Sequence, residues 1–576
     1  MALDIVIRNA SVIDGSGAPR FGADVAIAAG RIVEVGRISG PAREVIDAQG
    51  AVVSPGFIDG HTHMDAQVFW DSLGTCSCWH GVTSVVMGNC GFTLAPCRES
   101  EKDLVMRNLE RAEDISPQAM AAGIRWSWED FPQYLDAVDR LPKGINYAAY
   151  IGHSALRTYI MGERAFSEQA SEADLEAMKR EVRKAIRAGA IGFTTSRSFS
   201  HQTPQGQPVA SRLATWDEVR QLVGVMGELG AGVFELASED MRDHSRVPDY
   251  MGRLKALALD TGVPITLGVF SAKGLAPNYW KTLLGTIDDT VAAGGRMFGQ
   301  THTRSLNVLF SFETVTPFDR LPAWRDIRKR PLSEQEAALR DPGLRAHLIE
   351  AVKAHRPDAS AGVGAEVRDA NFKRIYPLDK PLPPYRSIAE IAEEQKKDPV
   401  EVVIDMALAR GLKQFFLQTI ANENQDEVLE MIRHPRTIPT FSDSGAHVSQ
   451  IMDSSLQTHL LSYWVREQQA LTLEDAVRRM TSVPAGCWGL EGRGLIREGY
   501  AADVIIFDPD RIGPQMPELA YDLPAGARRL KQKADGLLAT IVNGQVLLRN
   551  NEHTGAEPGR LLRGPLAQRT RVTNAA

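Results

Sequence analysis

The sequence predicts an α/β fold, namely a (β/α)₈ TIM-like barrel with a small β-sandwich domain formed from both chain termini. The middle of the chain alternates apolar strand candidates with helical stretches, which is typical of parallel sheets. Short alternating runs broken by glycine occur instead near the two ends. Polar residues of metal-binding types follow several apolar runs, and the carboxyl ends of barrel strands are where such a fold places its site.

The composite β-domain is predicted over residues 1–55 and 485–576. Its first part contains the runs "DIVIRNASVIDG", "ADVAIAAGRIVEVG" and "REVIDAQGAVVSPG", which show strand-turn-strand signals without a helical period. Similar runs return in "GYAADVIIFDP" and "GLLATIVNGQVLLRN", where Asn543-Gly544 is a strong hairpin turn. Strands at both termini around a different middle indicate one domain built from the two ends.

The barrel is predicted over residues 56–484 and needs eight strands. The clearest helix lies between two of them, from Ser171 to Gly189, where a serine cap, early acidic residues and a final glycine fit the helix start and stop rules. The eight strand candidates are "GAVVSPGFIDGHTH", "VTSVVMGN", "INYAAYIGH", "AIGFTTS", "AGVFELA", "VPITLGVF", "GGRMFGQTH" and "TIPTFSDSG".

Residues about 304–395 interrupt this alternation and are rich in Pro, Arg, Lys and Glu. One helix is predicted there, over "LSEQEAALRDPGLRAHLIEAVKAH", residues 332–355. A long insertion between late strands would form a lid over the barrel mouth. A peripheral, solvated subdomain is the equal alternative.

Composition narrows the classes of partner and compartment. The formal net charge of −7 over 576 residues argues against nucleic-acid binding, which requires a basic surface. No apolar stretch approaches the ~20 residues of a membrane span. The first residues lack a secretory signal and the five cysteines are an odd number, so a reducing cytoplasm is expected. The expected partner is a small-molecule amide, and association into a homo-oligomer is compatible with a barrel of this kind.

The strongest chemical signal is the stretch "VVSPGFIDGHTHMD". Residues i and i+2 of a strand point to the same side, so His61 and His63 would direct both imidazoles at one point. Asp443 ends strand eight, and a carboxylate after an apolar run is costly to bury without a cation or donors. Cys90 ends strand two and could bind metal as a thiolate. These four residues suit a divalent ion, zinc first, bound as one or two ions.

Such an ion would lower the pKa of a water molecule and polarise a carbonyl oxygen, which predicts metal-assisted hydrolysis of an amide or related C–N bond. Asp443 is the candidate acid–base, because it would touch both metal and water. Further polar candidates near the predicted strand ends are His153, Glu235, His302 and His447.

The candidates also have ordinary structural alternatives. Cys90 could fill a tight turn, Asp443 could cap a helix, and a histidine could bond a neighbouring carbonyl.

Five motifs together resemble the amidohydrolase superfamily, specifically its N-acyl-D-amino-acid deacylase (D-aminoacylase) branch: "PGFIDGHTHMD", "HGVTSVVMGNCGF", "GHSALR", "GAIGFTTS" and "FSDSGAH". The resemblance covers nearly the whole chain. It implies a (β/α)₈ barrel, zinc, and hydrolysis of N-acyl-D-amino acids. Carried over by position, His61, His63 and Asp443 match one metal site, with Asp443 also the general acid–base, and Cys90 matches the thiolate ligand of a second.

Two segments depart from the pattern that the resemblance implies. Strand five should carry a histidine followed by Arg and Glu, but "VFELASED" has Glu235 and Ala237 in those places. Strand six should carry Ser-His-x-Lys, but "VFSAKG" has Ser271 for the histidine. Lys273 fits the lysine that would pair with a substrate carboxylate. A site completed by Glu235, a single-metal site and a site with lost catalysis all remain open, and His153 or His302 could orient substrate or stabilise the oxyanion.

Two other functions are alternatives to the deacylation of N-acyl amino acids. A cyclic-amide hydrolase of the hydantoinase or lactamase kind usually has a carboxylated lysine at the end of strand four, where "AIGFTTSRS" has none. A non-catalytic barrel scaffold would not need a converging set of metal-type residues. Metal content separates the scaffold from the enzymes.

Overall fold

Parallel strands form the centre of the molecule, in the segments that the sequence predicted. The computed structural model describes residues 2–356 and 363–568. One parallel sheet has the order β18-β6-β7-β8 and another has the order β17-β13-β12-β11-β10-β9. The strands are β6 (Phe57–Thr62), β7 (Val82–Met87), β8 (Asn146–Ala149), β9 (Ile151–Gly152), β10 (Gly192–Ser196), β11 (Val233–Ala237), β12 (Ile265–Gly268), β13 (Met297–Thr301), β17 (Thr437–Pro439) and β18 (Phe441–Ser444).

The two sheets are continuous with each other along the chain at both ends. Only Tyr150 separates β8 from β9, and only Thr440 separates β17 from β18. If β8 and β9 are counted as one strand, and β17 and β18 as another, eight strands pair in parallel in a closed path that begins and ends at β6. Strands such as β7, with the sequence VTSVVM, are buried throughout, as expected of a sheet covered on both faces. This is the strand order that the predicted barrel requires.

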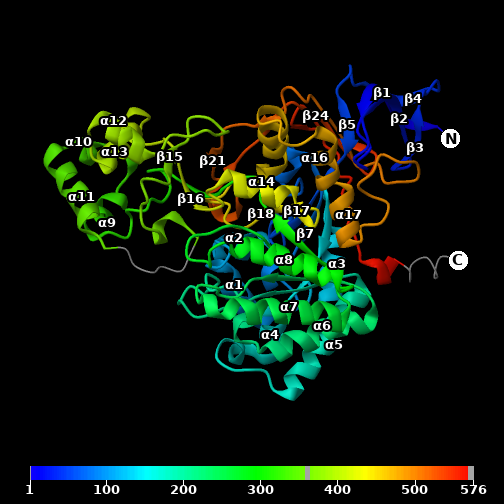
Figure 1. Ribbon diagram of the computed structural model, residues 1–576, viewed down its shortest axis with the longest axis horizontal. Helices are drawn as coiled ribbons and strands as arrows, with labels where there is room; N and C mark the ends of the chain where they lie inside the picture. Colours follow the sequence, from blue (N-terminus) through cyan, green and yellow to red (C-terminus); the bar gives the residue numbers. More distant parts are fainter. Residues whose placement is uncertain (1, 357–362, 569–576) are drawn as a thin grey trace.

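Helices alternate with these strands and surround them (Figure 1). The predicted helix at 171–189 is confirmed: α5 spans Glu172–Ala188, Ser171 caps its start and Gly189 ends it with φ of 114°. No helix in the part of the chain described is long and apolar enough to cross a membrane. The other helices are α1 (Lys102–Glu110), α2 (Pro117–Gly123), α3 (Phe131–Arg140), α4 (His153–Met161), α6 (Trp216–Leu229), α7 (Val247–Thr261), α8 (Tyr279–Ala292), α14 (Gln425–Arg433), α15 (Leu456–His459), α16 (Leu473–Met480) and α17 (Ser482–Trp488).

Strands from both ends of the chain share one nine-stranded sheet. Strand β5 pairs with β1 on one side and with β19 on the other. Asn543 and Gly544 form the predicted hairpin turn, with φ of 45° and 81°. Whether this domain is a sandwich stays a prediction, and Met1 and residues 569–576 lie outside the described residues. The strands are β1 (Leu3–Val12), β2 (Phe21–Ala28), β3 (Arg31–Gly36), β4 (Ala42–Asp47), β5 (Val52–Pro55), β19 (Val504–Phe507), β24 (Leu537–Val542), β25 (Gln545–Arg549) and β26 (Glu552–His553).

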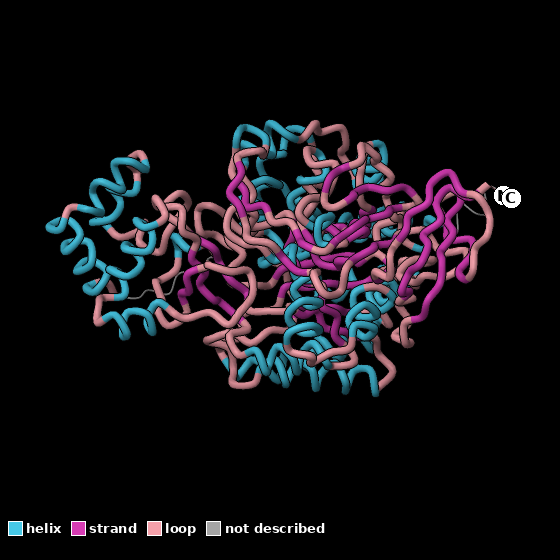
Figure 2. The backbone as a smooth tube through the Cα atoms, turned by 90° about the horizontal axis from the view of Figure 1, so that it is seen from above, coloured by secondary structure: helices cyan, strands magenta, loops and turns pink. Residues whose placement is uncertain are grey.

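The insertion forms a lobe with a hydrophobic core of its own, at the opposite end of the molecule from the terminal sheet (Figures 1 and 2). Its core extends past the predicted limit near 395, because Val403 and Phe416 pack into it. Residues 357–362 lie outside the described part of the chain. The lobe contains α9 (Pro322–Arg328), α10 (Leu332–Arg340), α11 (Pro342–Ala354), α12 (Ile388–Gln395), α13 (Pro399–Ala409) and the sheet β14 (Leu306–Phe310), β16 (Phe416–Ala421), β15 (Ile375–Pro377).

The single helix predicted over 332–355 is wrong. Helix α10 ends at Arg340, and α11 begins at Pro342. The Asp341 carboxylate accepts the Leu344 N–H at 2.7 Å and so caps the second helix, while Pro342 has no N–H to continue the first.

The base of the lobe is attached to the loop that follows β18. The Leu309 N–H donates to the Gln450 carbonyl oxygen at 2.7 Å, and the Ala365 N–H donates to Gln450 Oε1, also at 2.7 Å. Since β18 carries Asp443, the insertion is linked to a candidate site residue even though most of it extends sideways.

Candidate metal centre

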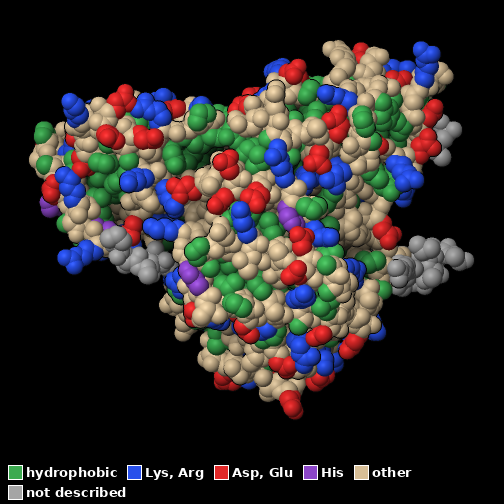
Figure 3. Space-filling model, in the orientation of Figure 1, with side chains coloured by type: hydrophobic (Ala, Val, Ile, Leu, Met, Phe, Trp, Pro, Cys, Tyr) green, Lys and Arg blue, Asp and Glu red, His purple; other side chains and the backbone are tan. Residues whose placement is uncertain are grey.

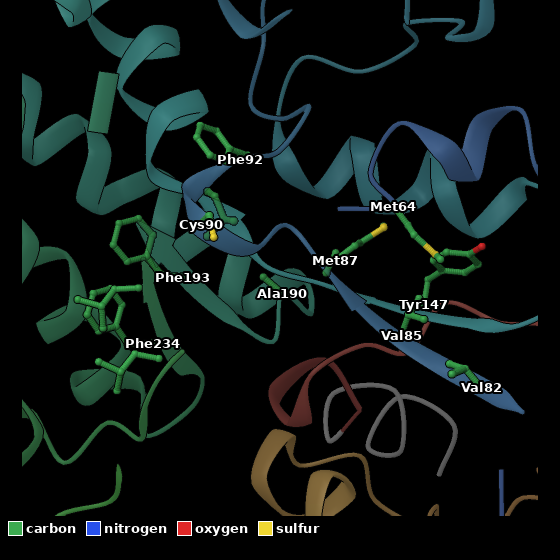
Figure 4. Close-up of a cluster of buried hydrophobic side chains, with 14 of the residues drawn as sticks. Met64, Val82, Val85, Met87, Cys90, Phe92, Tyr147, Ala190, Phe193 and Phe234 are labelled. Carbon is green, nitrogen blue, oxygen red and sulfur yellow. The ribbon is translucent and has the colours of Figure 1, made fainter. Parts of the chain in front are cut away.

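Three adjacent strands bring the four main candidates together. His61 lies in β6 and His63 follows it, while Asp443 lies in β18 and Cys90 in the turn after β7. Both imidazoles are buried, at 0% and 2% exposure. Cys90 and Asp443 have left-handed backbones, with φ of 55° and 51°. Figure 4 shows Cys90 beside Phe92 and Phe193, in a cluster of buried hydrophobic side chains.

The distances between donor atoms fit one metal ion. The Asp443 Oδ1 atom lies 3.2 Å from His61 Nε2 and 3.5 Å from His63 Nε2. Cys90 Sγ lies 3.5 Å from His61 Nε2. Donors at zinc-ligand distances in a tetrahedral arrangement are about 3.4 Å apart. One ligand atom from each of His61, His63 and Cys90 also lies within 4.8 Å of the others.

Buried polar atoms without partners support the same interpretation. Neither ring nitrogen of His63 has a hydrogen-bond partner, and neither does Glu235 Oε1. His61 is oriented through its other nitrogen, Nδ1, which lies 2.6 Å from Gln300 Oε1. Donation from Nδ1 to this oxygen would leave the Nε2 lone pair facing Asp443 and Cys90, which is the usual arrangement of a metal-ligating histidine. The residues present therefore fit a divalent cation.

Acidic groups concentrate around the two imidazoles. Burial raises the pKa of Glu235 to about 7, with its Oε1 atom 3.9 Å from His61 Nδ1 and its Oε2 atom accepting the Cys90 N–H at 2.7 Å. Burial would also raise the pKa of Asp443, but the adjacent imidazoles of His61 and His63 hold that pKa well below its usual range. Burial and the nearby carboxylates raise the pKa of the Cys90 thiol well above its usual value. A bound cation would offset this concentration of negative charge.

His302 and His447 lie at the edge of this centre. The His302 ring, buried directly after β13, lies 5.5 Å from the Phe441 ring, which in turn stacks on His61 at 3.8 Å. His302 Nδ1 is 3.9 Å from Asp453 Oδ2, and neither of its ring nitrogens is hydrogen-bonded. Burial lowers the pKa of His447 to about 4, so this side chain is neutral near pH 7.

Both ring nitrogens of His153 are hydrogen-bonded to other side chains of the protein, which does not favour the predicted contact with substrate. Its Nδ1 lies 2.8 Å from Thr195 Oγ1 and its Nε2 lies 2.8 Å from Glu218 Oε1. Arg157, itself fully buried, donates to both oxygens of Glu218 at 2.6 Å. Both ring nitrogens are therefore used within the protein.

Replacing His153 by alanine is expected to lower the free energy of unfolding by about 2 kcal/mol, since buried Glu218 and Thr195 each lose a partner. Metal content should stay at the wild-type level. Denaturant unfolding and elemental analysis measure the two quantities, and a loss of metal with unchanged stability would return His153 to the site.

Lys273 lies at a hollow on the surface. It is exposed in the loop after β12 and lines this hollow with Ser271, Arg374 and Asn424. The Ser271 N–H donates to Asn422 Oδ1 at 2.9 Å, which ties this loop to the end of β16. None of the four main candidates lines the same hollow, so the predicted contact of Lys273 with a substrate carboxylate stays a prediction.

Two residues near the centre were not predicted from the sequence. Gln300 lies in β13, two residues before His302, so the period of a strand could have indicated it. Glu113 lies in the loop between α1 and α2, where its Oε2 atom is 3.5 Å from His63 Nε2. No strand end or motif marks Glu113 in the sequence.

Buried imidazole, thiol and carboxylate donors lie together at the carboxyl ends of parallel strands, which is where a fold of this class places its functional site. A family model described as the amidohydrolase family matches residues 44–548. The chain belongs to this family of hydrolases, which act on carbon–nitrogen bonds.

Similar proteins match almost the full length of the chain. An N-acyl-D-aspartate deacylase of Alcaligenes xylosoxydans xylosoxydans is 27% identical, over 97% of this chain and 95% of that protein. An uncharacterized protein of Mycobacterium tuberculosis is also 27% identical, over 96% of this chain and 93% of its own. The crystal structure of an N-acyl-D-glutamate deacylase from Bordetella bronchiseptica, complexed with zinc and a phosphonate inhibitor, has a TM-score of 0.66, with 24% identity over 98% of this chain and 100% of that one. The structural likeness supports the fold.

Proposed function

We propose that this protein is a metal-dependent hydrolase that removes the acyl group from an N-acyl amino acid, with N-acyl-D-amino acids as the first class to test. The observation that carries the proposal is the close approach of buried donor atoms: Asp443 Oδ1 lies 3.2 Å from His61 Nε2 and 3.5 Å from His63 Nε2, and Cys90 Sγ lies 3.5 Å from His61 Nε2. The similarity to an N-acyl-D-aspartate deacylase supports the substrate class.

The proposed architecture is a (β/α)₈ barrel over residues 56–484, closed through Tyr150 and Thr440, with a β-domain from residues 1–55 and 485–576. The parallel pairings around eight strand positions support the barrel, and the shared nine-stranded sheet supports the β-domain. On the face shown in Figure 3, basic and acidic side chains are interspersed and form no continuous basic surface. This distribution agrees with a small-molecule substrate and does not favour nucleic acid. The five free cysteines agree with the proposed cytoplasmic location.

His61, His63 and Asp443 would hold the divalent ion, zinc first, with Cys90 and Glu235 beside them for the same ion or a second. When bound, the ion would supply Lewis acidity toward the substrate carbonyl oxygen and would lower the pKa of a water molecule. Donation of the His61 Nδ1 proton to Gln300 Oε1 would keep Nε2 available for the ion.

Asp443 would move the proton. The adjacent imidazoles of His61 and His63 hold the pKa of this carboxylate well below its usual range, so it would be ionised and could accept a proton from water as the oxygen attacks the amide carbon. It would then donate this proton to the amine nitrogen as the C–N bond breaks. The products would be a carboxylate and a free amino acid. The cyclic-amide alternative is less favoured, because β10 ends in Thr194, Thr195 and Ser196 and offers no lysine.

Elemental analysis of wild-type protein beside Cys90→Ala tests the metal centre. We expect two equivalents falling toward one in the variant if Cys90 joins two ions, or one unchanged equivalent if His61, His63 and Asp443 hold a single ion. Cys97→Ala is the matched control, since Cys97 is equally buried but its sulfur contacts the Arg98 carbonyl. The absence of metal from all three proteins would contradict the proposal and favour a scaffold.

A further inference from the structure

Glu113 approaches the metal centre from the loop between α1 and α2, not from a strand end. Its Oε2 atom lies 3.5 Å from His63 Nε2, which is the distance that also separates this nitrogen from Asp443 Oδ1. The same Oε2 atom lies 3.7 Å from His447 Nε2. Glu113 therefore has the donor-to-donor spacing of a ligand that shares an ion with His63.

The backbone holds Glu113 in this place from two directions. Its N–H donates to the Leu109 carbonyl oxygen at 2.9 Å, and its own carbonyl oxygen accepts the His447 N–H at 2.7 Å. The next residue, Asp114, accepts the Ser449 hydroxyl at 2.6 Å. The loop after α1 is thus fixed to the loop after β18, so the position of Glu113 is coupled to that of Asp443.

The carboxylate of Glu113 is buried without sufficient partners. Its side chain is 2% exposed, and its Oε1 atom has no hydrogen bond. A buried carboxylate of this kind is costly unless a cation meets it.

We propose that Glu113 is a further protein ligand of the metal centre, binding through Oε2 beside His63. This inference rests on the proposed function, because it requires that His61, His63 and Asp443 hold an ion. It assigns the centre a third carboxylate, after Asp443 and Glu235, and a ligand from outside the strand ends. Metal binding would then join the α1–α2 loop to the strands, since Glu113 and His63 would share the same ion.

Glu113→Gln tests the proposal through two readouts that do not depend on activity. In chelator competition, zinc affinity should fall at least about tenfold relative to wild type. After metal removal, the variant should melt no lower than wild type, because the buried Oε1 atom has no hydrogen bond for the substitution to break. A ligand lost by substitution lowers zinc affinity without lowering the melting temperature of the metal-free protein, whereas a residue that only holds the loop would lower that melting temperature.

Asp114→Asn is the matched control, since Asp114 holds the same loop through Ser449 and should keep wild-type zinc affinity when changed. Glu113→Asp, which keeps the charge but shortens its reach, should also bind zinc more weakly. Wild-type affinity in Glu113→Gln, or a lower melting temperature of its metal-free form, would overturn the inference while leaving the proposed function in place. A wild-type protein that binds no zinc or other divalent ion would overturn both.

Discussion

Replacing Asp443 by asparagine is expected to reduce kcat by about 10²- to 10⁴-fold with the fold intact. The side chain contacts both imidazole Nε2 atoms, so in the proposed function it would lie beside both the metal ion and the reacting water. An amide cannot accept the proton that the carboxylate takes. The left-handed φ of 51° at this residue suits asparagine, so the backbone should not change. Steady-state kinetics on N-acyl-D-amino acids and on their L-isomers, with circular dichroism and thermal melting, measure the effect.

Asp288→Asn makes the same chemical change on the surface, where Asp288 pairs with Arg436, and should leave kcat unchanged. Turnover close to wild type in Asp443→Asn would remove the proposed acid–base. If melting temperature fell together with turnover, the residue would have to be assigned a structural role instead.

In the metal-free protein, Glu235 should make stability fall as pH rises from about 4.5 to about 7. Its ordinary pKa is 4.5, and burial raises the folded-state pKa to about 7. Below pH 4.5 the group is protonated in both states. Between these values the unfolded chain loses the proton and the folded protein does not, so unfolding becomes easier by up to about 3 kcal/mol.

Denaturant unfolding of wild type and Glu235→Gln in chelator, across this pH range, measures that loss. The free energy of unfolding of the variant should increase relative to that of wild type as pH rises, with most of the change complete by pH 7. Glu239→Gln should behave oppositely: burial acts against it, but hydrogen bonds from Arg253 hold the pKa of Glu239 below its usual value. If the difference in unfolding free energy between wild type and Glu235→Gln does not vary with pH, the pKa of Glu235 is not raised in the folded, metal-free protein.

The sequence was most informative where local periodicity determines where a side chain points. His61 and His63 could be placed together because residues two apart in a strand share a side, and both do reach Asp443. Asp341-Pro342 is also a local signal, since it marks the break between α10 and α11, although the apolar pattern on either side suggested one helix.

The sequence was least informative where the position depends on contacts distant in the chain. Glu113 reaches His63 only because its loop is bonded to His447, and nothing in the residues around Glu113 indicates that partner. Lys273 shows the opposite case, since its spacing from Ser271 matched a family pattern but the loop bonds to Asn422 and lies at the surface. A motif fixes the order of residues, whereas tertiary contacts decide which of them meet.

The nine-stranded sheet has a consequence for how the nascent chain matures on the ribosome. Strand β5 leads through Gly56 into β6, which carries His61, yet its neighbour β19 is made only after residue 503. Until then one edge of β5 has no partner, and an unpaired edge is a site for wrong association. Synthesis from the N-terminus therefore delays the full anchoring of the strand that leads to His61 until β19 has emerged, so a translation product stopped before residue 504 would expose this edge of β5.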